Sequence, residues 1–165
     1  RGRIVLIADT LVHEWPDEED LADIAERAAS VARGLGLVPR VAFASFSTFG
    51  YPVSERATKM HLASDALDKR HVDFEYDGEM TVDVALNPDQ MKHYPFCRLT
   101  GPANVLVVPA RHSASISTKL LQERGGATVI GPILTGVDKP VQIISTGSTV
   151  NDILNMAAIS ACNIG

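Results

Sequence analysis

A hydroxyl- and glycine-rich bend near the end of the sequence is the clearest candidate for chemistry. Residues 145–149 (Ser-Thr-Gly-Ser-Thr) follow the apolar run 141–144, predicted to be a buried strand, and precede a segment with the pattern of a helix. Such a bend presents backbone N–H groups and hydroxyls beside the positive end of a helix, which favours anion binding. A second interpretation needs no ligand: Thr149 caps the helix and Asp152 completes a capping box.

Two further junctions between predicted strands and helices carry similar side chains. Residues 45–54 follow the apolar run 41–47, and residues 110–116 follow the run 104–109. In parallel sheets, ligands bind where strand carboxyl ends lead into helices, so we predict a small anionic ligand at these junctions. Arg111 would add a positive charge, although an arginine at such a position lies on the surface more often than it binds an anion. The candidate ligand-binding residues are Ser45, Ser47, Thr48, Arg111, Ser113, Ser115, Ser145, Thr146 and Ser148.

The sequence offers little support for a metal site. An acidic stretch from Glu14 to Asp20 lies beside His13, but a helix N-terminus explains this negative charge better than a metal ion does. The histidines are scattered, and none is paired with another at ligand spacing. Cys97 and Cys162 lie far apart without a CxxC motif, so we expect both to be reduced and buried. We therefore expect no metal ion and no cofactor in this chain.

The composition fits one α/β domain and excludes several classes of partner. The chain has 165 residues, 45% of them apolar and 21% charged, with a net charge of −5. No basic cluster suggests nucleic-acid binding, and no apolar run reaches the length of about 18 residues that spans a membrane. We expect a cytoplasmic protein. Because the sequence starts Arg-Gly-Arg without a methionine, we also expect a piece of a longer polypeptide.

Strand and helix patterns alternate along the chain. Buried strands are predicted at 4–8, 41–47 and 104–109, and the alternation at 72–76 predicts a half-exposed strand before an Asp77-Gly78 turn. Helical periodicity covers 21–35 and ends at Gly36, while Ser54 begins a second helix with Met60, Ala63 and Leu67 in the core. A third helix contains residues 116–121 and ends at Gly125-Gly126. This alternation predicts βαβ units, a mainly parallel sheet and an α/β/α fold.

The last predicted helix, at 150–162, differs from the others. Apolar residues cover nearly its whole circumference, with Asn155 and Ser160 as the polar breaks. We therefore expect it to be buried on more than one side.

Four segments together carry a family resemblance. They are 77–86 (DGEMTVDVAL), 103–109 (ANVLVVP), 131–140 (GPILTGVDKP) and 152–155 (DILN). The chain resembles the phosphate acetyltransferase, or phosphotransacetylase, family from about Ile4 to Ala161. Residues 113–117 and 155–159 narrow the resemblance to the C-terminal phosphotransacetylase-like domain of bacterial hybrid NADP-dependent malic enzymes.

The resemblance implies an isocitrate/isopropylmalate dehydrogenase-like fold with two α/β subdomains and a cleft between them. Residues from about 1 to 140 would form the second subdomain, and residues from about 141 to 165 would return into the first. Most of the first subdomain would then be encoded before residue 1.

The resemblance also implies roles for the bend at 145–149. Active transferases have Ser-Arg-Gly here: the serine and arginine contact the acyl phosphate, and an aspartate seven residues after the serine acts on the thiol of coenzyme A. Ser145, Gly147 and Asp152 match this pattern, but Thr146 replaces the arginine. Residues 110–115 also depart from the family's usual Asp-Leu-Asn-Ala-Gly-Asn. Threonine cannot supply a bidentate cation, so we expect no catalytic residue at these positions.

Two main functions follow as expectations. The first is a regulatory and oligomerising domain of an NADP-dependent malic enzyme, which decarboxylates malate to pyruvate, with acetyl-CoA as its effector. The second is an active phosphate acyltransferase that uses arginines of the absent subdomain, and a purely structural role is a third interpretation. In the first case the partners are the malic enzyme catalytic domain of the same polypeptide, which would hold NADP and a divalent metal, and a second copy bound through helix 150–162.

Overall fold

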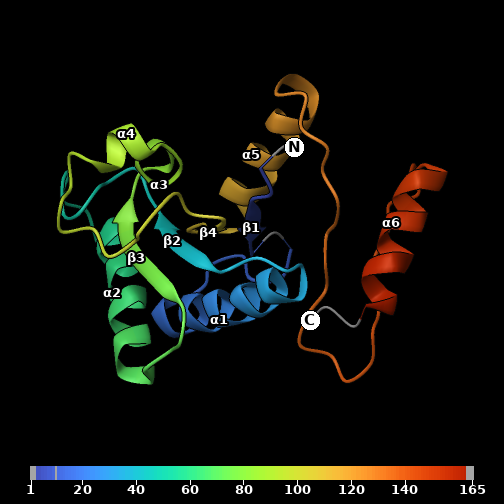
Figure 1. The fold of residues 1–165 in the computed structure, drawn as a ribbon, viewed down its shortest axis with the longest axis horizontal. Helices are drawn as coiled ribbons and strands as arrows, with labels where there is room; N and C mark the ends of the chain where they lie inside the picture. The colour runs from blue at the N-terminus through green and yellow to red at the C-terminus, as the bar shows by residue number, and fades with distance from the viewer. Residues whose placement is uncertain (1–2, 10, 163–165) are drawn as a thin grey trace.

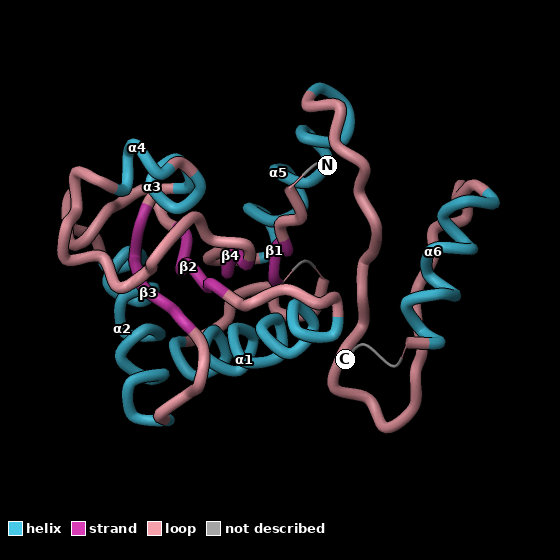
Figure 2. The backbone as a smooth tube through the Cα atoms, in the orientation of Figure 1, coloured by secondary structure: helices cyan, strands magenta, loops and turns pink. Residues whose placement is uncertain are grey.

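A computed structural model describes residues 3–9 and 11–162, which contain one four-stranded parallel sheet (Figures 1 and 2). Its strand order is β1-β4-β2-β3, and each pair of neighbours is parallel. The strands are β1 (Leu6–Ala8), β2 (Arg40–Ala44), β3 (Glu75–Met80) and β4 (Val105–Val107). The predicted α/β class and parallel sheet are therefore confirmed.

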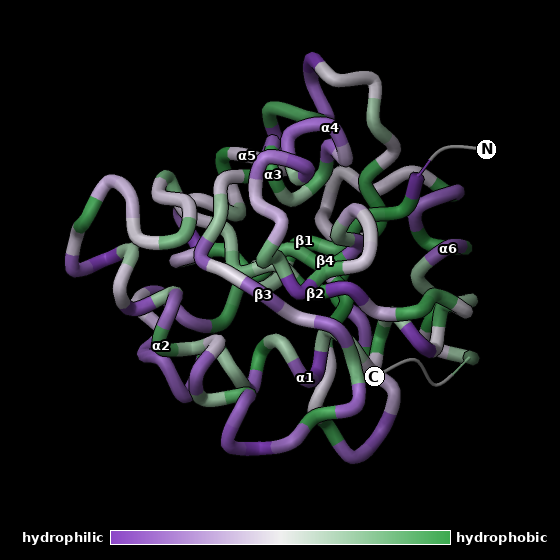
Figure 3. The backbone as a smooth tube through the Cα atoms, turned by 60° about the vertical axis from the view of Figure 1, so that its left-hand side comes forward, coloured by the Kyte–Doolittle hydropathy of each residue, from purple (hydrophilic) through white to green (hydrophobic). Residues whose placement is uncertain are grey.

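Alternate residues of the strands build a separate core on each face of the sheet. Val41 and Phe43 of β2 pack against α1 (Glu18–Gly34) and α2 (Glu55–Arg70). Ala42, between them, faces the opposite side, where α3 (Val82–Leu86) and α4 (Pro88–Met91) complete a smaller core. This alternation is the period of two that a strand buried on both faces requires. Figure 3 shows hydrophobic residues along β1 and β4 and mainly polar residues along β3.

Helix starts agree with the capping signals in the sequence. The Asp17 side chain accepts the N–H of Asp20, and the Asp20 side chain accepts the N–H of Asp17 at 3.1 Å. The Ser54 side chain accepts the N–H of Ala57 and begins α2. Each cap satisfies an N–H group that has no partner within its helix. The helix predicted after residue 110 is α5 (Arg111–Arg124), and Gly125 caps its end as expected.

The turn predicted at Asp77-Gly78 is wrong, because both residues lie inside β3. Gly78 has a φ of +144°, and a Cβ placed there would lie 2.8 Å from the carbonyl oxygen of Phe43 in β2. The register between the two strands also shifts between Phe43 and Ala44. Gly78 therefore serves a close approach of two strands and does not reverse the chain.

The segment after α5, residues 127–162, is here called the C-terminal arm. Residues 127–149 form neither helix nor strand, and α6 (Val150–Ala161) lies apart from the sheet in Figure 1. The strand predicted at 141–144 is therefore wrong for this structure. A strand needs a neighbour for its N–H and C=O groups, and none of the described strands pairs with these residues. Val141, Ile143 and Ile144 are each about half exposed.

The last helix, predicted to be buried on more than one side, is largely exposed within this single chain. Leu154 is 61% exposed and Val150 is 72% exposed, whereas Met156 is the one residue of α6 that is buried. Of the two free thiols, Cys97 is half-buried but Cys162 is exposed, which corrects the prediction that both are buried. No helix in the described ranges is long and apolar enough to cross a membrane.

Candidate functional site

The structure places two of the three predicted junctions side by side. Ala44 at the end of β2, Val108 just after β4 and Ala114 in the first turns of α5 pack in one small apolar cluster. The loop 45–54 and the start of α5 at 110–116 therefore leave the carboxyl edge of the sheet from neighbouring strands, as predicted. The third junction, 145–149, lies on the C-terminal arm beside α6 (Figure 1).

The hydroxyl groups of the loop after β2 are hydrogen-bonded to other groups of the protein. Ser47 is fully buried, and its hydroxyl donates to Glu79 Oε1 at 3.0 Å. The hydroxyl of Thr48 donates to Thr81 Oγ1 at 3.1 Å and accepts the N–H of Thr81 at 3.1 Å. Ser45 accepts the N–H of Ser47 at 3.3 Å. These bonds join the loop after β2 to the end of β3.

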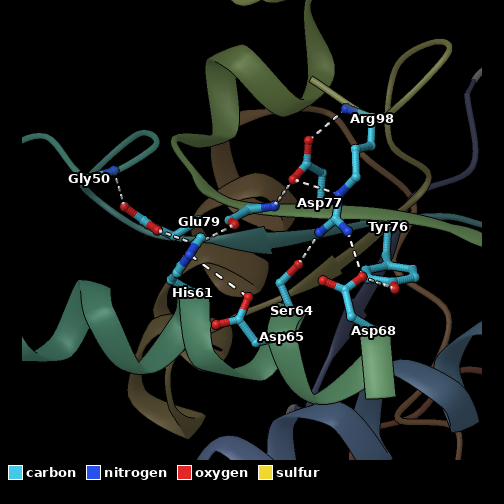
Figure 4. Close-up of polar contacts among 10 residues, drawn as sticks. Gly50, His61, Ser64, Asp65, Asp68, Tyr76, Asp77, Glu79 and Arg98 are labelled. Carbon is cyan, nitrogen blue, oxygen red and sulfur yellow. Dashed lines mark hydrogen bonds and ion pairs between the residues drawn. The ribbon is translucent and has the colours of Figure 1, made fainter. Parts of the chain in front are cut away.

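Glu79 is a buried carboxylate that the sequence analysis did not select as a site residue. Its side chain is 2% exposed, and Oε1 also accepts the N–H of Gly50 at 2.6 Å. Nδ1 of His61 lies 3.5 Å from Oε2 and 3.2 Å from the carbonyl oxygen of Gly78 (Figure 4). The turn predicted at Asp77-Gly78 leaves Glu79 outside the predicted strand at 72–76, so its only signal is its place in the family motif at 77–86.

A cavity of about 220 Å³ opens beside this carboxylate. Its lining comes from the loop after β2, the first turns of α2 and the end of β3, and consists of Ser47, Phe49, Gly50, Pro52, Val53, Ser54, Ala57, Thr58, His61 and Glu79. A wider hollow of about 470 Å³ is lined by residues of α1 and α2, mostly carboxylates, and does not involve the strand ends. Of the three predicted junctions, only residues 45–54 contribute to the described lining of the smaller cavity.

The junction after β4 presents donors that the protein does not cap. Ala110 occupies the N-cap position of α5 and has no side-chain acceptor for the N–H groups of the first turn. Arg111 and Ser113 are exposed beside it, and Ser115 is half-buried. His112 lies against Trp15, with 5.9 Å between the ring centroids. Uncapped N–H groups next to an exposed guanidinium form a positively polarised surface.

The bend at 145–149 has the capping geometry predicted for it. The N–H and hydroxyl of Thr149 both donate to Asp152 Oδ2 at 2.8 Å, and the N–H of Asp152 donates to the Thr149 hydroxyl at 3.2 Å. These bonds, led by the backbone N–H of Thr149, hold the pKa of Asp152 below its usual range. The hydroxyls of Ser145 and Ser148 are 3.3 Å apart, and Thr146 is exposed. Asp152 is therefore occupied as a cap and is a weak base.

An ion network that the sequence did not indicate fixes β3 next to Glu79. The Arg98 guanidinium donates to Asp68 at 2.6 Å and to the buried Ser64 hydroxyl at 2.6 Å, and its Nε lies 3.4 Å from Asp77 (Figure 4). It also lies over the Tyr76 ring, 4.7 Å from the centroid. Asp77 accepts the backbone N–H of Arg98 at 2.7 Å. The Asp77 side chain, two residues before Glu79, therefore holds β3 to the loop that carries Arg98.

Within residues 3–9 and 11–162, no group of three or more histidine, cysteine, aspartate or glutamate side chains could hold a metal ion. His13, which the sequence places beside the acidic stretch, instead contacts Asp9, with Nδ1 2.6 Å from the carboxylate. The three backbone N–H groups of residues 11–13 donate to the same carboxylate. This cluster explains the position of His13 without a ligand.

Comparison with known proteins agrees with this architecture. The family model described as phosphate acetyl/butaryl transferase matches residues 1–161. The chain is 62% identical over its full length to an NADP-dependent malic enzyme of Rhizobium meliloti, of which it covers 22%. It is 35% identical to a phosphate acetyltransferase of Bacillus subtilis, with 94% of this chain and 49% of the relative aligned.

Solved structures show the same fold. The EutD phosphotransacetylase from Staphylococcus aureus matches 100% of this chain and 52% of its own, with a TM-score of 0.90 at 32% identity. A phosphotransacetylase from Streptococcus pyogenes also has a TM-score of 0.90, at 33% identity over 96% of this chain and 48% of its own. The chain thus spans about a fifth of the malic enzyme and about half of the transferases. The resemblance found in the sequence is confirmed: the chain belongs to the phosphate acetyl/butaryl transferase family.

Proposed function

We propose that this chain is the phosphotransacetylase-like domain of an NADP-dependent malic enzyme, where it binds acetyl-CoA as an effector and does not transfer acetyl groups. The observation that carries the proposal is Thr146, which occupies the position where the family resemblance places a phosphate-binding arginine. The higher identity to a malic enzyme, 62% against 35% for a transferase, supports the same assignment. In this proposal NADP and a divalent metal bind the catalytic domain of the same polypeptide.

The chemistry of acetyl transfer explains why Thr146 matters. Transfer to a thiol needs a base that forms thiolate and a cation that holds the phosphate as charge develops on it. Threonine offers one hydroxyl, and the capping bonds to Asp152 weaken the nearby carboxylate as a base. Loss of one electrostatic stabiliser typically lowers the rate by about a hundred- to a thousandfold.

An assay with acetyl phosphate and coenzyme A tests the loss of transfer. We expect negligible turnover by the complete protein, a measurable gain in Thr146→Arg and no gain in the uncharged control Thr146→Gln. Turnover of wild-type protein as fast as that of a working transferase would refute this part and favour the second candidate, an active phosphate acyltransferase. The observation that favours this second candidate is the close similarity of the fold to two phosphotransacetylases.

The start of α5 is the best location for the phosphate groups of acetyl-CoA. The N–H groups of its first turn have no side-chain cap, and Arg111 adds an exposed positive charge next to them. A helix N-terminus with a guanidinium suits a phosphate. Ser113 and Ser115 lie within the same turns and supply hydroxyl donors, whereas those of Ser47 and Thr48 are already used.

Inhibition of malate oxidation is the expected regulatory outcome, because acetyl-CoA forms downstream of the pyruvate that a malic enzyme releases. Coupling between two sites is typically about 1–3 kcal/mol, so saturating acetyl-CoA should weaken malate binding roughly five- to a hundredfold. By linkage, malate with NADP should weaken acetyl-CoA binding by the same factor.

Steady-state kinetics and calorimetry on the complete malic enzyme test this coupling. Arg111→Gln should reduce inhibition, whereas the control Arg124→Gln, in the last turn of the same helix, should leave it unchanged. Acetyl-CoA inhibition that survives both Arg111→Gln and removal of residues 1–165 would overturn the regulatory role. Loss of malic enzyme assembly on the same removal would instead support a structural role.

Self-association through α6 is the remaining part of the proposal. Val150, Ile153 and Leu154 are each at least 46% exposed, which leaves an apolar surface without a cover in this chain. A second copy of the chain is the cover that we propose. The alternative is that this apolar surface is buried by the part of a phosphotransacetylase that this chain does not span. The chain covers only about half of the solved phosphotransacetylase chains.

A further inference from the structure

The cavity beside Glu79 has an acceptor that receives no hydrogen bond from the described residues. Glu79 Oε1 is satisfied by the Ser47 hydroxyl and the Gly50 N–H. No described residue donates a hydrogen bond to Oε2, and His61 Nδ1 lies 3.5 Å from it. A carboxylate that is 98% buried normally has a partner for each oxygen, because an unpaired buried charge is costly. Among the described residues, Thr118 Oγ1 is the enclosed polar side-chain atom without a partner, so Oε2 is not fully enclosed; since Glu79 lines the cavity, Oε2 is open to a ligand there.

The described residues of the lining form no hydrogen bond to Oε2, and His61 Nδ1 lies closer to the Gly78 carbonyl oxygen, at 3.2 Å. Phe49, Pro52, Val53 and Ala57 give the cavity an apolar wall. The Thr58 hydroxyl, which could have donated, is bonded to the Ser54 carbonyl oxygen at 3.0 Å. The cavity therefore offers an acceptor at one side and hydrocarbon around it.

We propose that this cavity binds a small molecule with an N–H donor on a short apolar chain, such as an alkylammonium ion or an N-alkyl amide. The N–H would donate to Glu79 Oε2 and the chain would pack against the apolar wall. A volume of about 220 Å³ holds roughly seven water-sized groups, which suits a chain of four carbons and its head group. An anion is excluded here, because its charge would face a buried carboxylate.

This site differs from the proposed acetyl-CoA site in both location and charge. Glu79 and the loop after β2 form the site, and neither the start of α5 nor malic enzyme activity is needed for binding there. Residues 45–54 then act indirectly: the Ser47 hydroxyl and the Gly50 N–H hold the Glu79 carboxylate, and that carboxylate selects the ligand.

NMR titration of the protein with three probes of equal chain length tests the ligand class. Butylammonium and N-butylacetamide should shift resonances of Val53, Ala57 and Gly50, while butyrate should not. If both N–H probes bind, the shared donor is sufficient, and if butylammonium alone binds, the ligand is a cation. Butyrate binding as tightly as butylammonium, or no binding by either N–H probe, would overturn the proposal and leave His61 as the partner of Oε2.

Two pairs of variants locate the effect at Oε2. Glu79→Gln keeps an acceptor for Ser47 and places an amide donor where Oε2 was, so butylammonium binding should weaken about ten- to a hundredfold. Glu123→Gln, an exposed change on α5 with the same change in charge, should have no effect. Should Glu79→Gln fail to fold, Val53 offers a second route, since it lines the cavity but is 85% exposed.

Val53→Arg places a cation at the cavity mouth, where it should compete for Glu79 and weaken the N–H probes at least tenfold. Val53→Gln has a similar reach without the charge and should bind the probes within about twofold of wild type. Equal probe binding by the two Val53 variants together with unchanged binding by Glu79→Gln would refute the assignment. Acetyl-CoA titrated into the same variants separates the two proposals, because its binding should not change with Glu79.

Discussion

Replacing Arg98 with methionine should destabilise this fold more than replacing any surface ion pair. Methionine keeps the apolar stem but removes the guanidinium, and with it the bonds to Asp68 and Ser64. Ser64 is fully buried, so the lost charge-assisted bond costs about 1.5 kcal/mol. The half-exposed Asp68 pair adds about 0.5 kcal/mol, and the contact with the Tyr76 ring adds about 0.5–1 kcal/mol.

The total is a loss of about 2–3 kcal/mol in the free energy of unfolding, or a melting temperature lower by about 5–10 °C. Urea denaturation followed by circular dichroism measures it. Asp77 keeps two backbone N–H donors after the change, from Gly78 and Arg98, so the variant should still fold. The environment of Glu79, two residues further along β3, should loosen at the same time and appear as faster amide exchange at Gly50.

Arg70→Met is the matched control. The Arg70 guanidinium contacts three carboxylates of α1, but those side chains are between 41% and 64% exposed. Exposed pairs contribute little and are screened by salt, so we expect a loss near 1 kcal/mol that shrinks in about 0.5 M sodium chloride. The cost of Arg98→Met should persist in salt. If Arg70→Met proves the more destabilising of the two, the reasoning from burial is refuted.

Three further predictions address other parts of the chain. Burial raises the pKa of the Cys97 thiol to about 11, leaving about one part in a thousand as thiolate at pH 8, so a thiol reagent should label the exposed Cys162 first. Equal labelling rates would contradict this. The hydrogen bond from the Tyr76 hydroxyl lowers the pKa of Asp68 below its ordinary value of 3.8. Ionised Asp68 therefore stabilises the fold above pH 3.8, and this stabilisation is lost as the pH falls through the lowered pKa of the folded state. Acid titration of Asp68→Asn should therefore show a shallower loss of stability than wild type, and an equally steep loss would count against it. Leu154→Glu on α6 should shift a self-associated protein to monomer in sedimentation experiments, while Val38→Glu, a change at a still more exposed residue outside the arm, should not.

Local signals in the sequence predicted the elements whose causes are themselves local. Asp17, Ser54 and Thr149 each satisfy N–H groups within three residues, so their identity and spacing define the helix starts. The spacing of Met60, Ala63 and Leu67 likewise places them in the core, where all three are fully buried. In each case the residues that explain the structure are neighbours in the sequence.

The wrong predictions concern features that depend on distant residues. Asp-Gly is a common turn pair, but Gly78 lies in a strand because β2 approaches it closely at Phe43. The apolar run 141–144 has the composition of a buried strand, but none of the described strands pairs with it. Composition states which residues can be buried, whereas burial also requires a surface that covers them.

The loop after β2 shows the same limit for function. A run of hydroxyls near a helix start predicts an anion site when only the loop is considered, yet Glu79 comes from 32 residues after Ser47 and uses the donors that the prediction assigned to a ligand. A sequence pattern shows which donors exist but not which are already bonded. Two of the three junctions differ in what they leave unbonded. The start of α5 keeps unbonded N–H groups beside Arg111 and suits a phosphate, whereas the cavity at Glu79 keeps an unbonded acceptor and suits an N–H donor. Because the two sites are separate and of opposite polarity, acetyl-CoA and butylammonium should bind at the same time. Competition between them would contradict this separation.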